Sequence, residues 1–394
     1  MLQATDLIVF SDDWGRHPFS CQHLIARLLA NNRVLWVNTV GYRRIKWCAY
    51  DIKRVAEKVS AWFAPTGPHT YTPHAANLRV ISPPCLPFGK IGLVRRFNAV
   101  SVCRAVNRAS KQWGFADPLL LTTLPSAADY LGHLGERLRI YYCVDDFTKW
   151  PGTHGALMHA LEERLLSKVD VVIASSEKLA MTRRREGIPT HLITHGVDLE
   201  HFKSIDKAEP ADILRSHCGP VVAYFGLIDE RCDLPLLTQL AESMIDVLFL
   251  IIGPWRVKPG RLARLHNVRI VGHVPYNNLP AFLVCVSALI LPYVVNELSE
   301  SVNPLKLKEY LATGLPVVAT PLPEVVKLGD LVNTAGDADG FRASLYRVLN
   351  AGRRYTPSLE AFLSQETWEV KAEQFSAIVQ AALSASRNSQ THAC

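Results

Sequence analysis

The sequence lacks the cysteine pairs that would staple an extracellular chain. Its nine cysteines are odd in number and include no CxxC pair, which argues against a disulfide framework and against a structural zinc site. Its 14 histidines include no HExxH motif, so metal-dependent hydrolysis is not expected. We therefore expect reduced, mostly buried cysteines, no required metal ion and no bound cofactor.

Long apolar runs are missing as well. No window reaches the roughly 18 apolar residues that a membrane-spanning helix requires. The opening residues, MLQATDLIVFSDD, contain no basic n-region, and Asp6 and Asp12 interrupt their apolar run. They indicate a first strand rather than a signal peptide, and we expect the protein to be cytoplasmic.

Acidic residues are scarce in the first half of the chain. Residues 1–200 hold 25 Lys and Arg against 17 Asp and Glu, whereas residues 201–394 hold 18 against 19, so the first half should meet an anionic partner. Segments 42–63 and 88–113 mix basic and aromatic residues. They suit contact with the anionic inner face of the cell membrane or with a lipid-diphosphate acceptor. An equal alternative is that they are ordinary basic faces of helices. No nucleic-acid module accompanies the charge, so no nucleic acid is expected.

Short apolar runs alternate with helix-length segments through most of the chain, which is typical of parallel strands joined by crossover helices. The expected strands are 6–11, 33–38, 78–82, 119–123, 140–144 and 169–176, then 221–227, 246–253, 268–274, 288–293 and 316–320. Because these runs are continuous rather than alternating, both faces of each sheet should be covered. The predicted fold class is α/β, with two Rossmann-like, doubly wound domains facing an interdomain cleft.

The domain boundaries follow from the breaks in this pattern. Residues 195–212 are polar and rich in turn residues and lack helical periodicity, so they should separate the domains. We expect domains at 1–198 and 199–365, a C-terminal helix at 366–386, and a frayed tail at 387–394.

The segment ESVNPLKLKEYLATGLPVVAT, residues 300–320, carries the densest chemistry. Asn303 suits an N-cap, Pro304 the first helical position and Gly314 the C′ position, which predicts a helix over 304–313. Its amino end, reinforced by Lys306, could bind a diphosphate, and Glu309 could accept hydrogen bonds from a ribose diol. The alternative is an amphipathic helix with solvated lysines, on which Glu309 pairs with Lys306 or Lys308.

This segment resembles the donor site of the retaining glycosyltransferases of family 4, the glycosyl transferases group 1, which have the GT-B fold. Further segments resemble the same family in the same order: ASSEKL, THGVDLEHF, VVAYFGLID, LIIGP, VGHVPYNNLPAFL and LILPY. The match is densest from about residue 170 to 325 and favours the teichuronic-acid and exopolysaccharide type of enzyme.

The resemblance implies that the second domain binds a nucleotide-sugar donor and the first binds the acceptor, with a C-terminal helix crossing back to the first domain. By this resemblance, Glu309 binds the ribose, and His273 and Val274 lie beside the base. The backbone of Asn303, Pro304 and Leu305 binds the diphosphate. The same resemblance places Gly226 close to the phosphates.

Two departures from the family pattern affect these roles. Ser301 stands where the family has a Glu that contacts the donor sugar, so Ser301 is the candidate at that position. The usual Arg and Lys that follow the first strand of the second domain are replaced by FGLIDERCDL, in which only Arg231 is basic. Lys306, Arg256 and Arg16 are the candidate substitutes, because a leaving diphosphate needs cationic stabilisation.

Two loops in the first half supply the remaining candidates. Residues 11–29 follow the first strand and open a helix that Ser20 should cap; Trp14, Gly15, Arg16 and His17 could touch phosphate or acceptor there, or Asp12 or Asp13 could simply hold the loop by pairing with Arg16. Asp145 and Asp146 end another strand and could orient an acceptor hydroxyl, or serve a turn.

The Asp-x-Asp at 337–339 lies in a glycine-flanked turn and is expected to cap a helix rather than bind metal. The resemblance implies the function of a retaining hexosyltransferase that moves a sugar from a nucleotide diphosphate to a saccharide hydroxyl, on a lipid-linked glycan for a cell-envelope or exported polysaccharide. A nucleotide-sugar epimerase or phosphorylase of the same fold, and a catalytically degenerate binding subunit, are the alternatives.

Overall fold

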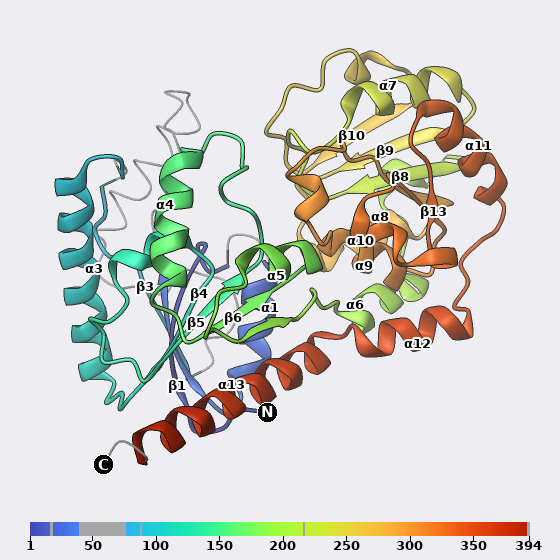
Figure 1. The fold of residues 1–394 in the computed structure, drawn as a ribbon. Helices are drawn as coiled ribbons and strands as arrows, with labels where there is room; N and C mark the ends of the chain where they lie inside the picture. Colours follow the sequence, from blue (N-terminus) through green and yellow to red (C-terminus); the bar gives the residue numbers. More distant parts are fainter. Residues whose placement is uncertain (16–18, 39–75, 87–88, 216, 392–394) are drawn as a thin grey trace. The chain divides into compact units, whose positions relative to one another are not determined.

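The computed structural model describes residues 1–15, 19–38, 76–86, 89–215 and 217–391, with side chains described up to residue 385. The chain divides into two compact units. Unit 1 comprises residues 1–194 and 371–394, and unit 2 comprises residues 195–370. Both are α/β units built on a parallel sheet, as the alternation of apolar runs predicts (Figure 1).

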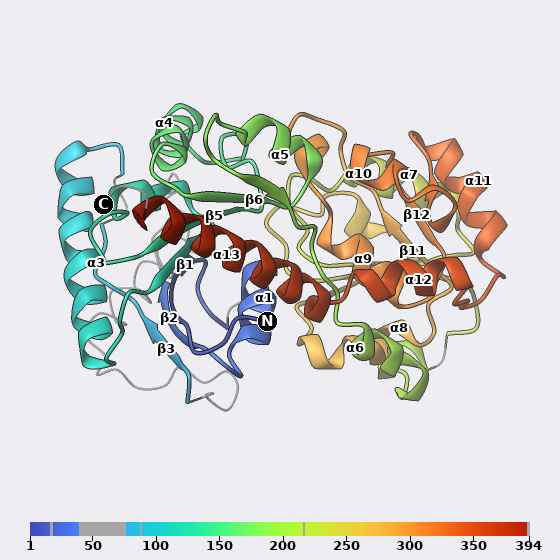
Figure 2. The same cartoon turned by 60° about the horizontal axis from the view of Figure 1, so that its bottom comes forward.

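Unit 1 contains a seven-stranded sheet in the order β3-β2-β1-β4-β5-β6-β7, in which every neighbouring pair is parallel. Its strands are β1 Asp6–Ser11, β2 Arg33–Asn38, β3 Leu78–Ile81, β4 Leu119–Thr122, β5 Leu138–Cys143, β6 Val171–Ala174 and β7 Thr190–Leu192. The described helices that accompany them are α1 Ser20–Leu28, α3 Gly92–Gln112, α4 Gly155–Leu166 and α5 Glu177–Arg183, with a 3₁₀ turn at Pro125–Asp129. The central strands are buried because helices cover both faces of the sheet, as Figure 2 shows from a second side.

Unit 2 contains a six-stranded parallel sheet in the order β10-β9-β8-β11-β12-β13. Its strands are β8 Val221–Phe225, β9 Leu248–Ile252, β10 Val268–Gly272, β11 Ala288–Leu291, β12 Val317–Ala319 and β13 Asn333–Thr334. Its α-helices are α6 Leu199–Lys203, α7 Leu234–Ser243, α8 Leu279–Leu283, α9 Leu305–Ala312, α10 Pro323–Val326, α11 Ala338–Val348 and α12 Pro357–Gln365. The strand order reverses between β8 and β11, which makes the carboxyl ends of these two strands the expected ligand-binding edge.

The C-terminal region differs from the sequence-based expectation. Helix α13 runs over Trp368–Thr391, so the segment expected to be a frayed tail from residue 387 is helical as far as Thr391. The polar segment 195–212, expected to separate the domains, begins where unit 2 begins and contains the short helix α6 and a 3₁₀ turn at Ser204–Lys207. Asp198 caps α6 by accepting a hydrogen bond from the His201 amide at 3.3 Å, a local signal that the turn-rich composition concealed.

Within the described residues, no helix is both long and apolar enough to cross a membrane.

Candidate functional site at the carboxyl ends of β8 and β11

Lys306, in the first turn of α9, is held over the end of β8. Its Nζ donates hydrogen bonds to Tyr224 Oη at 2.7 Å and to the Leu227 carbonyl at 3.0 Å. The same ammonium lies 4.8 Å from the Tyr224 ring centroid and 5.8 Å from that of Tyr293, distances at which the ring faces attract a cation. The side chain therefore has a fixed position instead of the solvated one that an amphipathic surface helix would give it.

Gly226, the first residue after β8, gives Lys306 its room. A Cβ at this position would lie 1.9 Å from Lys306 Cε, and the backbone has a φ of 133°, a conformation that residues other than glycine rarely adopt. The resemblance had suggested that this glycine lets phosphates approach. The structure gives a reason that involves only the chain itself, because glycine here lets the lysine cross the strand end.

Arg231 supplies a second cation beside Lys306. Its guanidinium makes a bidentate ion pair with Asp229, at 3.0 and 2.8 Å, and lies 5.9 Å from the Tyr293 ring centroid. Burial pushes the pKa of Asp229 up, but hydrogen bonds from Arg231 and the charges of Arg231 and Lys306 outweigh it and hold that pKa below its usual range. Arg231 and Lys306 thus share Tyr293 and Asp229 as neighbours, so the arginine that appeared displaced in the sequence belongs to the same cluster.

The amino end of α9 lies one residue later than predicted. The helix spans Leu305–Ala312, and Pro304 is its N-cap with extended backbone angles, φ −70° and ψ 106°, so Asn303 is not the cap. Asn303 is 6% exposed as a whole residue, and its side-chain amide makes no hydrogen bond with any other described residue, which leaves that amide available to a ligand. Gly314 has a φ of 69° and follows the helix as predicted.

Glu309 and Lys308 lie on the same helix but differ in burial and in their partners. Lys308 is buried, forms an ion pair with Glu366 and donates to the His195 carbonyl, so it is a structural residue within unit 2. Glu309 is partly exposed and makes no hydrogen bond or ion pair with the other described residues. Desolvation raises the pKa of its carboxyl to about 7, although the nearby charge of Lys306 lowers it. The alternative in which Glu309 pairs with a lysine of its own helix is wrong.

The other donor-site candidates also belong to unit 2 but differ in exposure. Arg256 is exposed and its amide donates to the Ile228 carbonyl at 2.8 Å, and His273 is exposed immediately after β10. Val274 is half-buried against the core of unit 2. Ser301 is 3% exposed and its hydroxyl donates to the Glu297 carbonyl at 3.1 Å.

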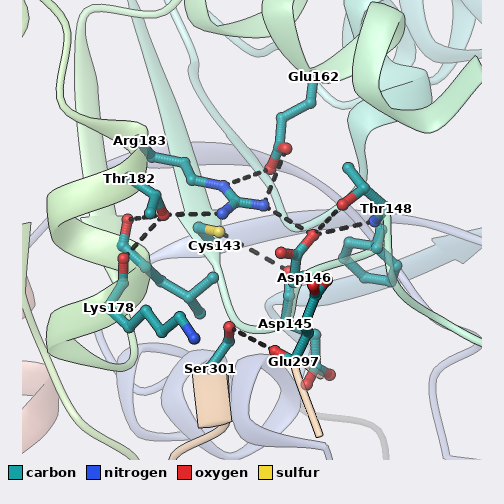
Figure 3. A network of polar contacts seen from close by, with 12 residues as sticks. Cys143, Asp145, Asp146, Thr148, Glu162, Lys178, Thr182, Arg183, Glu297 and Ser301 are labelled. Carbon is teal, nitrogen blue, oxygen red and sulfur yellow. Dashed lines mark hydrogen bonds and ion pairs between the residues drawn. The ribbon is translucent and has the colours of Figure 1, made fainter. Parts of the chain in front are cut away.

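In unit 1, Asp146 serves the structure of a turn. It pairs with Arg183 at 2.9 Å and accepts from the Thr148 amide at 3.1 Å (Figure 3). Arg183 also pairs with Glu162 at 3.1 Å, and Glu162 accepts from Tyr141 Oη at 2.7 Å. Burial alone would raise the pKa of Asp146, but Thr148 and Arg183 lower it below its usual range. Of the two aspartates, half-buried Asp145 is therefore the better candidate to meet an acceptor.

The loop after β1 is described only in part. The Trp14 amide donates to Asn38 Oδ1 at 3.0 Å, its ring packs edge-on against Trp36, and the Gly15 amide donates to Gln22 Oε1 at 3.1 Å. Arg16 and His17 lie outside the described residues. Ser20 is the first residue of α1 and does not cap it, because Phe19 occupies the N-cap position and α1 has no side-chain cap.

The Asp-x-Asp sequence caps a helix, as predicted. Asp337 is the N-cap of α11 and accepts from the Gly340 amide at 2.8 Å, while Asp339 pairs with Arg342 at 2.8 Å. The described residues contain no group of three or more His, Cys, Asp or Glu side chains placed to hold a metal ion.

Sequence reasoning missed three members of the site, namely Tyr224, Asp229 and Tyr293. Both tyrosines sit in or directly after apolar strand runs, where an aromatic residue is usually part of the core. Only the strand order, which places β8 beside β11, reveals that the hydroxyl of Tyr224 and the rings of both tyrosines lie around Lys306.

Comparison with known proteins agrees with this geometry. Residues 220–351 match the family model described as Glycosyl transferases group 1. A Bacillus subtilis (strain 168) protein, provisionally named a teichuronic acid biosynthesis glycosyltransferase, is 30% identical over 182 residues. That match covers 44% of this chain and 45% of the relative, so it spans about half the length of either protein.

Similar solved structures extend over nearly the whole chain. Sucrose-phosphate synthase from Thermosynechococcus elongatus has a TM-score of 0.70 at 16% identity, covering 97% of this chain and 100% of its own. HepE of Anabaena in complex with UDP and glucose has a TM-score of 0.64 at 13% identity, covering 95% and 99%. A UDP-forming trehalose-phosphate synthase from Burkholderia vietnamiensis has a TM-score of 0.63 at 14% identity, covering 95% and 96%. The chain therefore has the GT-B fold, and the part of unit 2 from residue 220 to 351 is similar to the glycosyl transferases group 1 family.

Proposed function

We propose that the protein is a glycosyltransferase that takes a sugar from a nucleotide-diphosphate donor and transfers it to a saccharide hydroxyl with retention of configuration. The observation that carries this proposal is the arrangement on α9. Lys306 is fixed beside Arg231 at the end of β8, and Glu309, three residues further along, has no hydrogen-bond partner among the described residues. The amino end of α9 suits the diphosphate anion, and the Glu309 carboxylate suits the ribose diol.

The donor is assigned to unit 2. Lys306, Arg231 and the backbone at Asn303–Leu305 would hold the diphosphate, Glu309 the ribose hydroxyls, and His273 and Val274 the base. Solved relatives titled as complexes with UDP, UDP and glucose, or UDP-glucose support a uridine nucleotide as the first to test. Ser301 and Arg256 are proposed to lie toward the sugar and phosphates.

The chemistry asked of the chain is mainly electrostatic. As the bond between the sugar and the diphosphate breaks, negative charge grows on the leaving oxygen, and the positions of Lys306 and Arg231 would stabilise it. In a front-face displacement, an oxygen of the departing diphosphate helps to accept the proton of the acceptor hydroxyl. Asp145 of unit 1 is proposed to orient that hydroxyl. No step requires a metal ion or a cofactor other than the donor itself.

The acceptor is assigned to unit 1 and is proposed to be a lipid-linked glycan for a cell-envelope or exported polysaccharide. The curated relative is named for teichuronic acid biosynthesis, and unit 1 holds the surplus of basic residues. Such an acceptor places the enzyme at the cytoplasmic face of the cell membrane as a peripheral protein.

The test is to titrate the full chain with UDP and then incubate it with a panel of nucleotide sugars, measuring release of nucleotide diphosphate with and without polyprenyl-linked saccharides. Glu309→Ala removes the proposed diol acceptor, and UDP affinity should fall about tenfold or more, the scale of a hydrogen bond to a charged group. Glu360→Ala, at an exposed site on α12, is the matched control and should bind as wild type.

Each rival predicts a different outcome. An epimerase would convert a nucleotide sugar without releasing the nucleotide, and a binding subunit would bind UDP with no turnover of any donor. If no nucleotide in the panel binds, or if Glu309→Ala binds as tightly as wild type, the donor site is misplaced and the proposal is wrong.

A further inference from the structure

Helix α3 of unit 1 has one face in the core and a long opposite face in solvent. Asn98, Val102, Val106 and Ser110 are its buried residues. The exposed face is the row Leu93, Phe97, Val100, Arg104, Arg108 and Lys111. Their spacings of three and four residues place them on a single stripe along the helix. We call this row the α3 stripe.

The first half of the α3 stripe is apolar. Leu93 is 75% exposed, Phe97 54% and Val100 47%, and Ile91, just before the helix, is 52% exposed. Single exposed apolar side chains are ordinary, but a contiguous group of large ones marks an interaction surface. Figures 1 and 2 both show α3 at the margin of unit 1, with the described strands on one side of it only.

The second half of the stripe is basic. Arg104, Arg108 and Lys111, together with Arg96, are exposed, and none of the four pairs with a carboxylate of the described residues. Arg95 differs, because it turns toward Asp129 at 3.4 Å. The sequence has no Asp or Glu between Glu57 and Asp117, while it has eight Lys and Arg there.

We propose that the α3 stripe docks on the surface of an anionic lipid bilayer. A helix with protruding apolar side chains and neighbouring cations can lie in the interface plane, with the apolar groups inserted among the headgroups and the cations near the anionic lipids. A second copy of the chain is disfavoured, because two stacked stripes would place cations against cations if the helices were parallel and against apolar side chains if they were antiparallel. This proposal names the residues that would make the membrane contact of the proposed function. It rests on the proposed function only for the reason why the protein would bind a membrane.

The experiment is vesicle flotation of the full chain. Vesicles of phosphatidylcholine alone are compared with vesicles in which about one-third of the lipid is phosphatidylglycerol, and the wild type should partition at least about tenfold more strongly onto the anionic ones. Arg104→Glu/Arg108→Glu should reduce that partitioning by about 25-fold or more, since each cation near such a surface contributes about fivefold. Higher salt should weaken binding as well.

The double variant Leu93→Ser/Phe97→Ser tests whether apolar side chains insert into the bilayer. It should lose binding to anionic vesicles even at low salt, where the attraction between the cations and the lipids remains. Two control pairs match these changes at exposed sites elsewhere: Met181→Ser/Ile245→Ser for the apolar pair and Arg215→Glu/Arg261→Glu for the charged pair. Circular dichroism and UDP titration verify that every variant is folded.

Equal partitioning of the wild type onto neutral and anionic vesicles would overturn the proposal, as would control pairs that lose binding to the same degree as the stripe variants. If Leu93→Ser/Phe97→Ser instead converts a dimer into a monomer on size exclusion, with vesicle binding unchanged, the stripe is a contact between copies. Loss of vesicle binding with intact UDP affinity concerns the stripe alone, whereas a wild type that binds no nucleotide of the panel refutes the proposed function.

Discussion

At the level of single residues, Glu309 makes the stability of the unliganded protein depend on pH. Its pKa of about 7 lies above the 4.5 of an ordinary Glu because burial disfavours the charge. The folded protein therefore binds the proton more tightly than the unfolded chain. This contribution is complete below about pH 4.5 and is lost as the pH rises through 7, at most about 3 kcal/mol. Glu309→Gln lacks the titration.

Urea unfolding at pH 5 and pH 8 checks this prediction. Wild type should lose stability relative to Glu309→Gln between the two values, so that the variant is the more stable protein at pH 8. Equal differences between the two proteins at both pH values would mean that the carboxyl is solvated and its pKa ordinary.

Lys308 is expected to matter for folding and not for donor contact. Its side chain is 6% exposed and that of Glu366 13%, so Lys308→Met leaves a carboxylate in a nearly dry site and should cost about 3–5 kcal/mol of unfolding free energy. Adding Glu366→Gln should recover part of the loss, which a double-mutant cycle in denaturant measures. Additive losses would show that the two side chains do not interact.

At the level of elements, substitutions at the start of α11 distinguish two roles of the Asp-x-Asp sequence, namely capping a helix and binding a metal ion. Asp337→Ala removes the hydrogen bond to the Gly340 amide and should cost about 1 kcal/mol. Asp339→Ala removes only an exposed pair with Arg342 and should cost about half of that or less. Thermal unfolding compares them, and nucleotide-sugar turnover should be unaffected by either change. A large loss of turnover in both variants would point to a metal site.

Sequence patterns located the long strands because their apolar runs are continuous. The bounds of β1 and β2 match the prediction at both ends. In contrast, β7 and β13 were missed because they are three and two residues long, polar in part and at sheet edges. The helix start at 305 was displaced by one residue, since an extended Pro304 can serve as the N-cap itself.

The candidate site was predictable only where chemistry and spacing coincide. Lys306 and Glu309 became candidates through their spacing on one helix together with the resemblance of that segment, because spacing alone left open a helix with solvated lysines. The partners of Lys308 and Lys306 do not, because Glu366 and Tyr224 lie 58 and 82 residues away in the chain, and only the tertiary fold brings them together.

At the level of the whole molecule, nucleotide binding should protect unit 2 selectively. In hydrogen exchange on the full chain, UDP should slow the amides around Gly226 and at the start of α9 and leave the β1–β4 core of unit 1 unchanged, since a ligand suppresses local opening where it binds. Glu309→Ala at the same UDP concentration is the control and should show weaker protection. Protection confined to unit 1 would reverse the assignment of donor and acceptor.

If Glu309 binds the donor as proposed, its raised pKa couples donor binding to the release of a proton,. Near pH 7 about half of the empty molecules hold a proton on this carboxyl,. Ribose hydroxyls donate hydrogen bonds, so they favour the carboxylate and would drive that proton into solution. Each binding event should then release roughly half a proton at pH 7 and almost none at pH 9. Calorimetry in two buffers of different ionisation enthalpy measures this stoichiometry, and Glu309→Gln should abolish it.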